Sequence, residues 1–302
     1  MTIQKQHQGK RPTAAAVAKL AGVSTTTVSF VLNKRVGSGI PKSTQESVLE
    51  AARQLGYRPN LVARSLASGQ TNTMAFWITK LSAMVYFTWV EFMLQEVQSH
   101  GYDLIISERG KAAIGTAEEF RSAPEWPVDG LFAYGPWVSQ YLELNQMHTP
   151  TVVIGPYPAE GIDYVGVTFR NAEIEAVEHL IYGGRKRIVG IYAPTMVPFQ
   201  DEHLDAYREA MARAGLQEEV FQIPGVSRSN GYEGVKEYLE SRSCPEAFVC
   251  RNDDVAIGVM RGLKEAGIRI PEDVAIVGSD GLEDTEYHEP PISTISIPFA
   301  EI

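Results

Sequence analysis

Residues 17–33, VAKLAGVSTTTVSFVLN, carry the strongest fold signal in the chain. Thr13 is placed to cap a first helix over residues 14–20, which consists almost entirely of strong helix formers. A glycine interrupts that helix, and Ser24 is placed to cap a second helix over residues 25–32. Two short helices joined by a glycine-containing turn are typical of a helix-turn-helix.

The apolar residues around this stretch repeat at helical spacing. Val17, Leu20 and Ala21 fall on one face of the first helix. A third helix is predicted to open with a capping box at residues 43–46, STQE, and to end at Gly56. We therefore expect a head of three short helices around a small core.

The charge of the chain is divided unevenly. Residues 1–71 hold ten Lys and Arg against two acidic residues, a formal charge of +8, whereas residues 72–302 carry −18 and the whole chain −10. A basic head on an acidic body predicts different partners for the two parts, with a polyanion for the head. The hydroxylic stretch Thr25–Thr27 suits base edges and thymine methyl groups, although a β-branched surface patch is the plain alternative.

A second motif, LGYRPNLVARSLASG at residues 55–69, follows the first at a fixed distance. Together the two motifs resemble the LacI/GalR family of bacterial transcriptional regulators, from about Arg11 to Ser68. The resemblance implies that the second helix reads the major groove of double-stranded DNA. It also implies that a short hinge helix orders in the minor groove, where Leu66 wedges into a base step beside its counterpart from a second subunit. Phe30 stands where many members have arginine or histidine, and it either touches a thymine methyl group or turns into the core.

The expected partner of the head is thus a palindromic operator bound by a homodimer. The DNA-binding residues that we expect lie in the second helix, in the loop after it and in the hinge segment: Ser24, Thr25, Thr26, Thr27, Ser29, Phe30, Asn33, Lys34, Arg35, Tyr57, Asn60, Ala63, Arg64 and Leu66.

Beyond Gln70, short apolar runs alternate with helical stretches, which predicts βαβ units, parallel sheets and an α/β fold of two lobes. Strands are expected over residues 74–78, 104–107, 130–133, 151–154, 164–167, 187–191, 248–250 and 274–278, with helices over residues 86–100, 172–182, 204–215, 231–241 and 255–266. The resemblance implies a Rossmann-like body similar to periplasmic sugar-binding proteins, with a ligand cleft between its lobes.

The predicted organisation is a helix-turn-helix domain over residues 1–57, a hinge helix and linker over residues 58–71, and a two-lobed effector-binding and dimerisation domain over residues 72–302. Family members usually continue for a further helix and strand beyond the segment that ends here at Ile302, so truncation at this end is expected.

Four residues are candidates for binding a small-molecule effector, a sugar or related metabolite. Phe87 follows the first strand, and Asn252 and Asp280 follow later strands at positions that the family uses. For Asn252 and Asp280 the alternative is that they cap the next helices. The fourth candidate, His203, stands where the family often has an arginine.

Two further departures weaken a simple sugar assignment. Gly155 stands where an aspartate is usual, and Arg170-Asn171 stands at the family's D-N-x-x-G position. Arg251 and Lys80 near the cleft would suit an anionic effector or be solvated rim charges. The alternative function is therefore a LacI-type regulator that has lost its small-molecule response or that responds to a protein co-regulator.

Enzyme signatures are missing from the sequence. It contains no GxxxxGK[ST], GxGxxG or GxSxG motif, and its six histidines show no pair at metal-ligand spacing, so we expect no catalytic residue, cofactor or metal. No membrane-length apolar run, export signal or disulfide framework is evident. These features oppose an exported solute-binding protein and indicate a cytoplasmic, nucleoid-associated regulator with no membrane partner.

Overall fold

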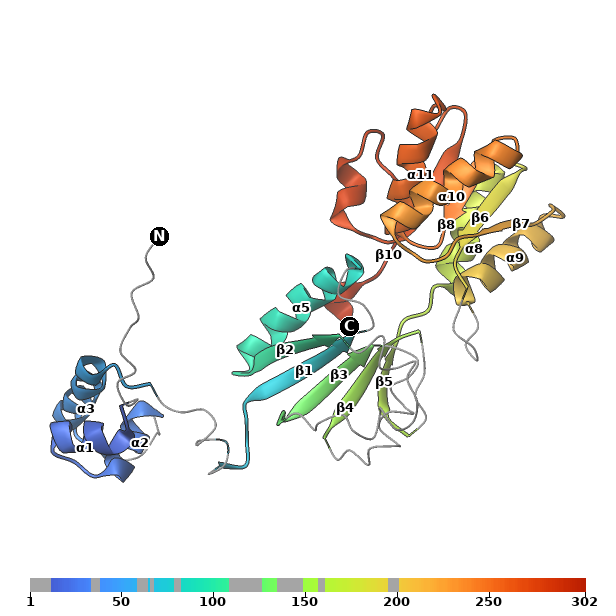
Figure 1. Ribbon diagram of the computed structural model, residues 1–302. Helices are drawn as coiled ribbons and strands as arrows, with labels where there is room; N and C mark the ends of the chain where they lie inside the picture. The colour runs from blue at the N-terminus through green and yellow to red at the C-terminus, as the bar shows by residue number, and fades with distance from the viewer. Residues whose placement is uncertain are drawn as a thin grey trace, which may run out of the picture. The chain divides into compact units, whose positions relative to one another are not determined.

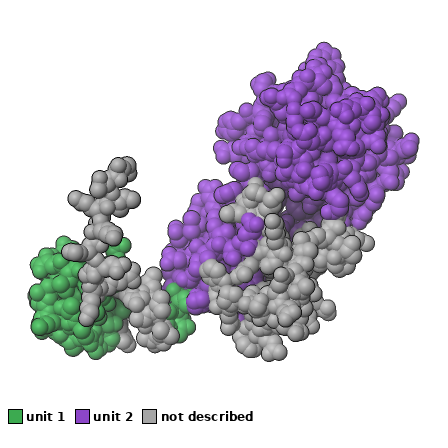
Figure 2. Space-filling model, viewed as in Figure 1, with its two compact units in different colours: residues 1–71 green, residues 72–302 purple. Residues whose placement is uncertain are grey.

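A computed structural model of the 302-residue chain describes residues 12–33, 39–58, 65, 68–78, 83–108, 127–134, 149–156, 161–194 and 201–302. The chain divides into two compact units, residues 1–71 and residues 72–302, which Figure 2 shows in different colours. We call them the head and the body.

The described part of the head includes three helices, α1 (Ala14–Ala21), α2 (Thr25–Leu32) and α3 (Lys42–Leu55), drawn in blue in Figure 1. The predicted caps of the first two are confirmed. Thr13 Oγ1 accepts a hydrogen bond from the Ala16 N–H at 3.2 Å, and Ser24 Oγ accepts one from the Thr27 N–H at 3.1 Å. Gly22 ends α1 with a φ of +68°, a left-handed conformation that glycine adopts without steric cost.

Two details of the predicted head are wrong. The capping box at residues 43–46 does not form, because α3 begins at Lys42, two residues before the start that the box predicts, with Pro41 at its N-cap and no side-chain cap. Leu20 is 51% exposed, because α1 buries the face that carries Val17 and Ala18 instead. These two side chains pack on Val28, Val31, Val48, Ala51 and Ala52 to form the small apolar cluster of the head.

The described residues of the body form two parallel sheets, as the alternating sequence pattern predicts. The first has the order β2-β1-β3-β4-β5 and consists of β1 (Thr73–Ile78), β2 (Asp103–Glu108), β3 (Gly130–Tyr134), β4 (Thr151–Gly155) and β5 (Asp163–Gly166). The second has the order β10-β9-β8-β6-β7 and consists of β6 (Ile188–Tyr192), β7 (Glu219–Gln222), β8 (Ala247–Cys250), β9 (Ala275–Asp280) and β10 (Ser293–Ser296). β7 and β10 were not predicted.

Helices connect and cover the strands: α5 (Val85–Ser99), α8 (Arg170–Tyr182), α9 (Glu202–Arg213), α10 (Arg228–Ser241) and α11 (Asp253–Glu265), with 3-10 turns at Glu283–Tyr287 and Phe299–Glu301. The second sheet is covered on both faces (Figure 1). Alternate residues of β6 show this, since Val189 and Ile191 pack with α10 and α11 whereas Ile188 and Tyr192 pack with α8 and α9.

Glycines allow α10 and α11 to pack backbone against backbone. A Cβ at Gly258 would lie 2.0 Å from the Arg228 carbonyl oxygen, and one at Gly231 would lie 2.3 Å from the Val255 carbonyl oxygen. No larger residue fits at either position without separating the helices.

The chain passes from the first sheet to the second between β5 and α8, and it returns after β10. Ile297 and Phe299 pack into the core of the first sheet, where the Phe299 and Trp89 rings lie edge to face with centroids 5.2 Å apart. Among the described residues no single helix is long and apolar enough to cross a bilayer, and the one consecutive pair that meets the length and composition test, α1 with α2, is bent by 101°.

Candidate functional site

The first turn of α2 presents its hydroxyl groups at the surface of the head. Thr25 and Thr26 are exposed, while the hydroxyl groups of Ser24 and Thr27 are hydrogen-bonded to each other at 2.9 Å. At the other end of α2, the Asn33 amide donates to Ser29 Oγ at 3.2 Å. A helix N-terminus carries a partial positive charge, so this exposed end of α2 favours an anionic partner such as a phosphate.

The remaining predicted DNA contacts are less exposed or lie elsewhere. Phe30 is half-buried but does not belong to the apolar cluster of the described head, whereas Tyr57 packs against that cluster. Ser65 is helical, and its carbonyl accepts a hydrogen bond from the N–H of Gly69, which has a φ of +72°. Six predicted contacts lie outside the described residues: Lys34, Arg35, Asn60, Ala63, Arg64 and Leu66.

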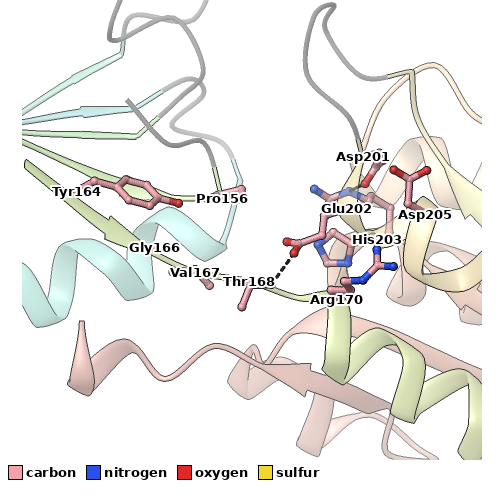
Figure 3. Close-up of a pocket in the computed structure, with 11 residues that line it drawn as sticks. Pro156, Tyr164, Gly166, Val167, Thr168, Arg170, Asp201, Glu202, His203 and Asp205 are labelled. Atoms are coloured by element: carbon pink, nitrogen blue, oxygen red, sulfur yellow. Dashed lines mark hydrogen bonds and ion pairs between the residues drawn. The ribbon is translucent and has the colours of Figure 1, made fainter. Parts of the chain in front are cut away.

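The body contains a cavity of about 580 Å³ that residues from both sheets and from α9 line (Figure 3). Its polar lining includes Tyr164 on β5, Thr168, Arg251 just after β8, and Asp201, Glu202 and His203 at the N-terminus of α9. Arg251 and Pro156 each follow the carboxyl end of a strand, which is where open α/β sheets bind ligands.

His203 is the best-defined polar group in this cavity. Its side chain is 2% exposed, its ring stacks on Phe169 with centroids 4.3 Å apart, and a hydrogen bond of 3.0 Å joins its Nδ1 to Glu173 Oε2. The Tyr192 hydroxyl donates to the other oxygen of Glu173 at 2.9 Å. Burial lowers the pKa of His203 well below its usual value and raises the pKa of Glu173 to about 7, because both charged forms lose hydration.

The cations of the cavity have carboxylate neighbours. Arg251 Nε lies 3.5 Å from Asp201 Oδ1, and Arg170 forms an ion pair with Glu209. Since these carboxylates offset the positive charge, the described lining does not single out an anionic effector. Lys80, the other basic residue considered for such a ligand, lies outside the described residues.

Glu202 occupies the junction between the sheets. It accepts hydrogen bonds from the Thr168 hydroxyl at 2.5 Å, drawn as a dashed line in Figure 3, and from the Phe169 N–H at 3.1 Å. Thr168 and Phe169 belong to the segment that connects β5 to α8. The N-terminus of α9 is therefore fastened to this connection at the cavity wall.

Of the four predicted effector residues, only His203 lines the cavity among the residues that the structure describes. Phe87 is 51% exposed on the first turn of α5. Asn252 caps α11, because its Oδ1 accepts from the Val255 N–H at 2.9 Å, and its amide donates to the Val226 carbonyl at 3.3 Å. Asp280 is buried at the end of β9 with a φ of +128°, and burial raises its pKa well above the usual value.

The capping alternative thus holds for Asn252 and fails for Asp280, since Leu282 is the N-cap of the next helical turn.

The sequence did not predict three polar residues of the cavity region, Glu173, Asp201 and Glu202. For Glu173 a signal was available: this residue falls on the same face of α8 as Val177 and Leu180, both buried. Among the described residues, no group of three or more His, Cys, Asp or Glu side chains is arranged to hold a metal ion.

Gly155 has a steric reason for being a glycine. It ends β4 with a φ of +120°, and a Cβ at this position would lie 2.6 Å from the Tyr134 ring. Its carbonyl accepts a hydrogen bond of 2.6 Å from the Tyr164 hydroxyl, which borders the cavity. An aspartate at this position would meet both a disfavoured backbone conformation and an occupied space.

Comparison with known proteins agrees with both parts of the chain. The family model described as "Bacterial regulatory proteins, lacI family" matches residues 15–60, and the one described as "Periplasmic binding protein-like domain" matches residues 177–302. The HTH-type transcriptional repressor PurR of Vibrio cholerae serotype O1 (strain M66-2) is 30% identical over 289 residues, covering 93% of this chain and 85% of that protein. The HTH-type transcriptional regulator AscG of Escherichia coli (strain K12) is 31% identical over 303 residues, covering 96% and 88%.

Solved structures show the same relationship. A crystal structure of the Lac repressor dimer bound to operator and the anti-inducer ONPF matches with a TM-score of 0.79 and 25% identity, covering 97% of this chain and 89% of that chain. The transcriptional regulator CelR in complex with cellobiose matches with a TM-score of 0.62 and 26% identity, covering 96% and 89%. The relatives named here are transcriptional regulators rather than enzymes. This chain belongs to the LacI family and is a DNA-binding transcriptional regulator with a periplasmic-binding-protein-like body.

Proposed function

We propose that the protein is a repressor that binds a palindromic operator as a homodimer and responds to a small molecule in the cavity of its body. The observation that carries the proposal is the exposed N-terminus of α2, with Thr25 and Thr26 at the surface of a head whose formal charge is +8. Operator binding implies that the protein acts at the nucleoid, in the cytoplasm.

In the proposed complex, α2 enters the major groove by its N-terminus. Thr25 and Thr26 contact base edges, whereas Ser24, Asn33, Lys34 and Arg35 contact phosphates. The hinge segment orders in the minor groove, where Ala63 packs on the groove floor and Leu66 wedges into the central base step. Ser29, Thr27, Phe30, Tyr57, Asn60 and Arg64 complete the proposed interface.

The proposed ligand binds in the cavity at the connection between the two sheets. A molecule that binds there with different affinity in two arrangements of the body shifts their populations, and with them the spacing of the hinge segments. Because coupling is reciprocal, operator DNA must change the affinity for the ligand by the same factor. The Lac repressor structure contains ONPF and the CelR structure contains cellobiose, which supports a sugar-like effector here.

A second candidate function is a regulator that answers to a protein or to no small molecule. His203 and Gly155, which depart from the family pattern in and beside the cavity, favour this alternative. Thermal-shift screening of the full-length protein with sugars, nucleosides and organic acids separates the two. A compound that changes both the melting temperature and operator affinity supports the first function, and a screen with no such compound supports the second.

The DNA-binding part is tested by selecting bound sequences from a random duplex pool with the wild type and with Thr26→Ala. We expect a two-fold symmetric consensus for the wild type, and for Thr26→Ala a relaxed preference of about 1–3 kcal/mol at one position of each half-site. Ser47→Ala, which removes an exposed hydroxyl group on α3, is the matched control. An unchanged consensus for Thr26→Ala would remove this residue from the base contacts, and the absence of any symmetric consensus would contradict operator binding.

A further inference from the structure

The two nitrogens of the His203 ring have different surroundings. Nδ1 is hydrogen-bonded to Glu173 Oε2 at 3.0 Å. Nε2 is buried, and among the described residues it has no hydrogen-bond partner. His203 is one of the residues that line the cavity (Figure 3), and no side chain or backbone group among the described residues competes with a bound molecule for its Nε2. A buried nitrogen without a partner costs free energy that a ligand can recover by bonding to it.

Glu173 controls what this open nitrogen can do. Its Oε1 accepts from the Tyr192 hydroxyl, so a single proton lies between its Oε2 and His203 Nδ1. When that proton is on the imidazole and Glu173 is ionised, Nε2 carries a lone pair and accepts hydrogen bonds. When the pair gains one proton, the protonated Glu173 donates to Nδ1, and the neutral ring carries its hydrogen on Nε2, which then donates.

We propose that Glu173 is a positioning residue that sets the tautomer of His203, so that the cavity selects a hydrogen-bond donor on the ligand when the pair is deprotonated and an acceptor when the pair has gained one proton. The inference deepens the proposed ligand site and rests on it. When the His203–Glu173 pair gains a proton, the incoming proton binds at His203 Nε2, and the proton on Nδ1 moves to Glu173 Oε2.

The groups around the pair decide where the added proton resides. Burial is the largest influence on both members, and it raises the pKa of Glu173 to about 7 while it lowers the pKa of His203 well below its usual value. Arg251, beyond β8, lowers the pKa of both, whereas Asp201 and Glu202 at the start of α9 raise that of His203. The other titratable neighbours of Glu173 are Tyr192 on β6 and Cys250 on β8, and burial keeps both neutral by raising their pKa. Acidification therefore neutralises Glu173 before it forms an imidazolium.

A second acceptor in the same wall strengthens the assignment of ligand chemistry. Asp201 Oδ1 is buried and has no hydrogen-bond partner among the described residues, although Arg251 Nε lies 3.5 Å from it. With the pair deprotonated, Nε2 requires a donor, and Asp201 Oδ1 can accept a second hydrogen bond beside its ion pair with Arg251. The cavity then favours a molecule that carries hydroxyl or amine groups over a carboxylate or an ether, which present acceptors only.

The tautomer can be observed directly in the full-length protein with its histidine rings labelled with ¹⁵N. Long-range ¹H–¹⁵N spectra from about pH 5.5 to about pH 8.5 report which ring nitrogen carries the proton. The His203 signals are those lost in His203→Asn. We expect Nδ1–H at the alkaline end and Nε2–H at the acidic end, with a midpoint near pH 7 and no imidazolium.

Three variants sharpen this measurement. Glu173→Gln holds a neutral amide that donates to Nδ1, so the ring stays in the Nε2–H form over the whole range. Tyr192→Phe removes a hydrogen bond that lowers the pKa of Glu173, so the midpoint of the His203 tautomer change moves to higher pH in this variant. Glu175→Gln makes the same chemical change on the exposed face of α8 and behaves like the wild type. A single tautomer at every pH in the wild type, an imidazolium at the acidic end, or a Glu173→Gln protein that titrates like the wild type would overturn the proposal.

Selectivity is tested with two small probes, ethylene glycol, which has hydroxyl donors, and 1,2-dimethoxyethane, which has ether acceptors only. Above the midpoint only the diol shifts the His203 signals, and below it both probes do. If neither probe shifts them, or if the ether does so above the midpoint, the selection rule is wrong.

Failure of this inference can be told apart from failure of the proposed function. A tautomer that fails to switch in a protein that selects a symmetric operator refutes this inference alone. A switching tautomer in a protein that selects none refutes the proposed function alone.

Discussion

The head and the body of this regulator use polar side chains in opposite ways. In the head the polar groups of α2 are exposed, and the core consists of a few Val and Ala side chains. In the body, polar and charged groups such as Glu173, His203 and Asp253 are buried among large aromatic and aliphatic residues. The head therefore exposes its polar groups to a large partner such as duplex DNA, whereas the body buries polar groups beside a cavity.

Salt provides the largest expected contrast between the two parts. Binding of the full-length protein to non-specific duplex should weaken by about 10³-fold between about 50 and 200 mM salt if about six phosphates are neutralised, since the log–log slope is about −0.9 per phosphate. Binding of an uncharged ligand to the body should barely change over the same range. Fluorescence anisotropy measures the first and calorimetry the second. A flat salt response of the head would contradict its phosphate contacts.

The next largest effect is expected from Leu66→Ala. Loss of the wedge should reduce specific operator binding by a few kcal/mol, because the kinked duplex loses its apolar support, while non-specific binding and its salt slope persist. Electrophoretic titration with operator and with scrambled duplex measures both. Equal losses on the two duplexes would show that Leu66 acts through general affinity rather than through a wedge.

Within the body, Gly258→Ala should reduce the free energy of unfolding by about 1–3 kcal/mol, because its Cβ meets the Arg228 carbonyl across the α10–α11 contact. Gly183→Ala is the matched control, since its Cβ would lie 3.3 Å or more from its neighbours. Urea unfolding measures the difference. Non-specific DNA binding at low salt should remain unchanged for both variants, and a parallel loss would mean that the body contributes to it.

The smallest effects concern two equivalent caps. Ser24→Ala and Asn252→Ala each remove a side-chain oxygen that accepts from a helix N–H, which costs about 0.5–2 kcal/mol of stability. Asn252→Ala should be the more costly, because Asn252 is buried and also donates to the Val226 carbonyl. Separate melting transitions of head and body in calorimetry report the two losses. A larger loss for Ser24→Ala would reverse the comparison.

Much of the fold could be predicted because its signals are local. Thr13 and Ser24 act over three residues of chain, and the alternating strands and helices of the body follow from runs of apolar residues. The capping box at residues 43–46 failed because Pro41 is the N-cap residue of α3, two positions before the Ser43 that the motif requires. β7 and β10 have four residues each and lie at the two edges of the second sheet, where half-exposed strands leave a weak apolar pattern.

The candidate site could be predicted only in part, because its geometry depends on contacts between distant residues. His203 was found from its position in the family pattern, but its partner Glu173 lies thirty residues away and on another helix. For Asn252 the sequence left capping and ligand binding equally open, and only the distance of 2.9 Å to the Val255 N–H assigns the cap.

Gly155 limits how the wall of the cavity can be redesigned. A side chain at this position would meet the Tyr134 ring at 2.6 Å and would have to adopt a φ of +120°. A smaller residue in place of Tyr134 removes the first obstacle but leaves the second, because the backbone strain belongs to position 155 itself. Engineering of ligand specificity therefore has to start from other lining residues, such as Thr168 or His203, rather than from the end of β4.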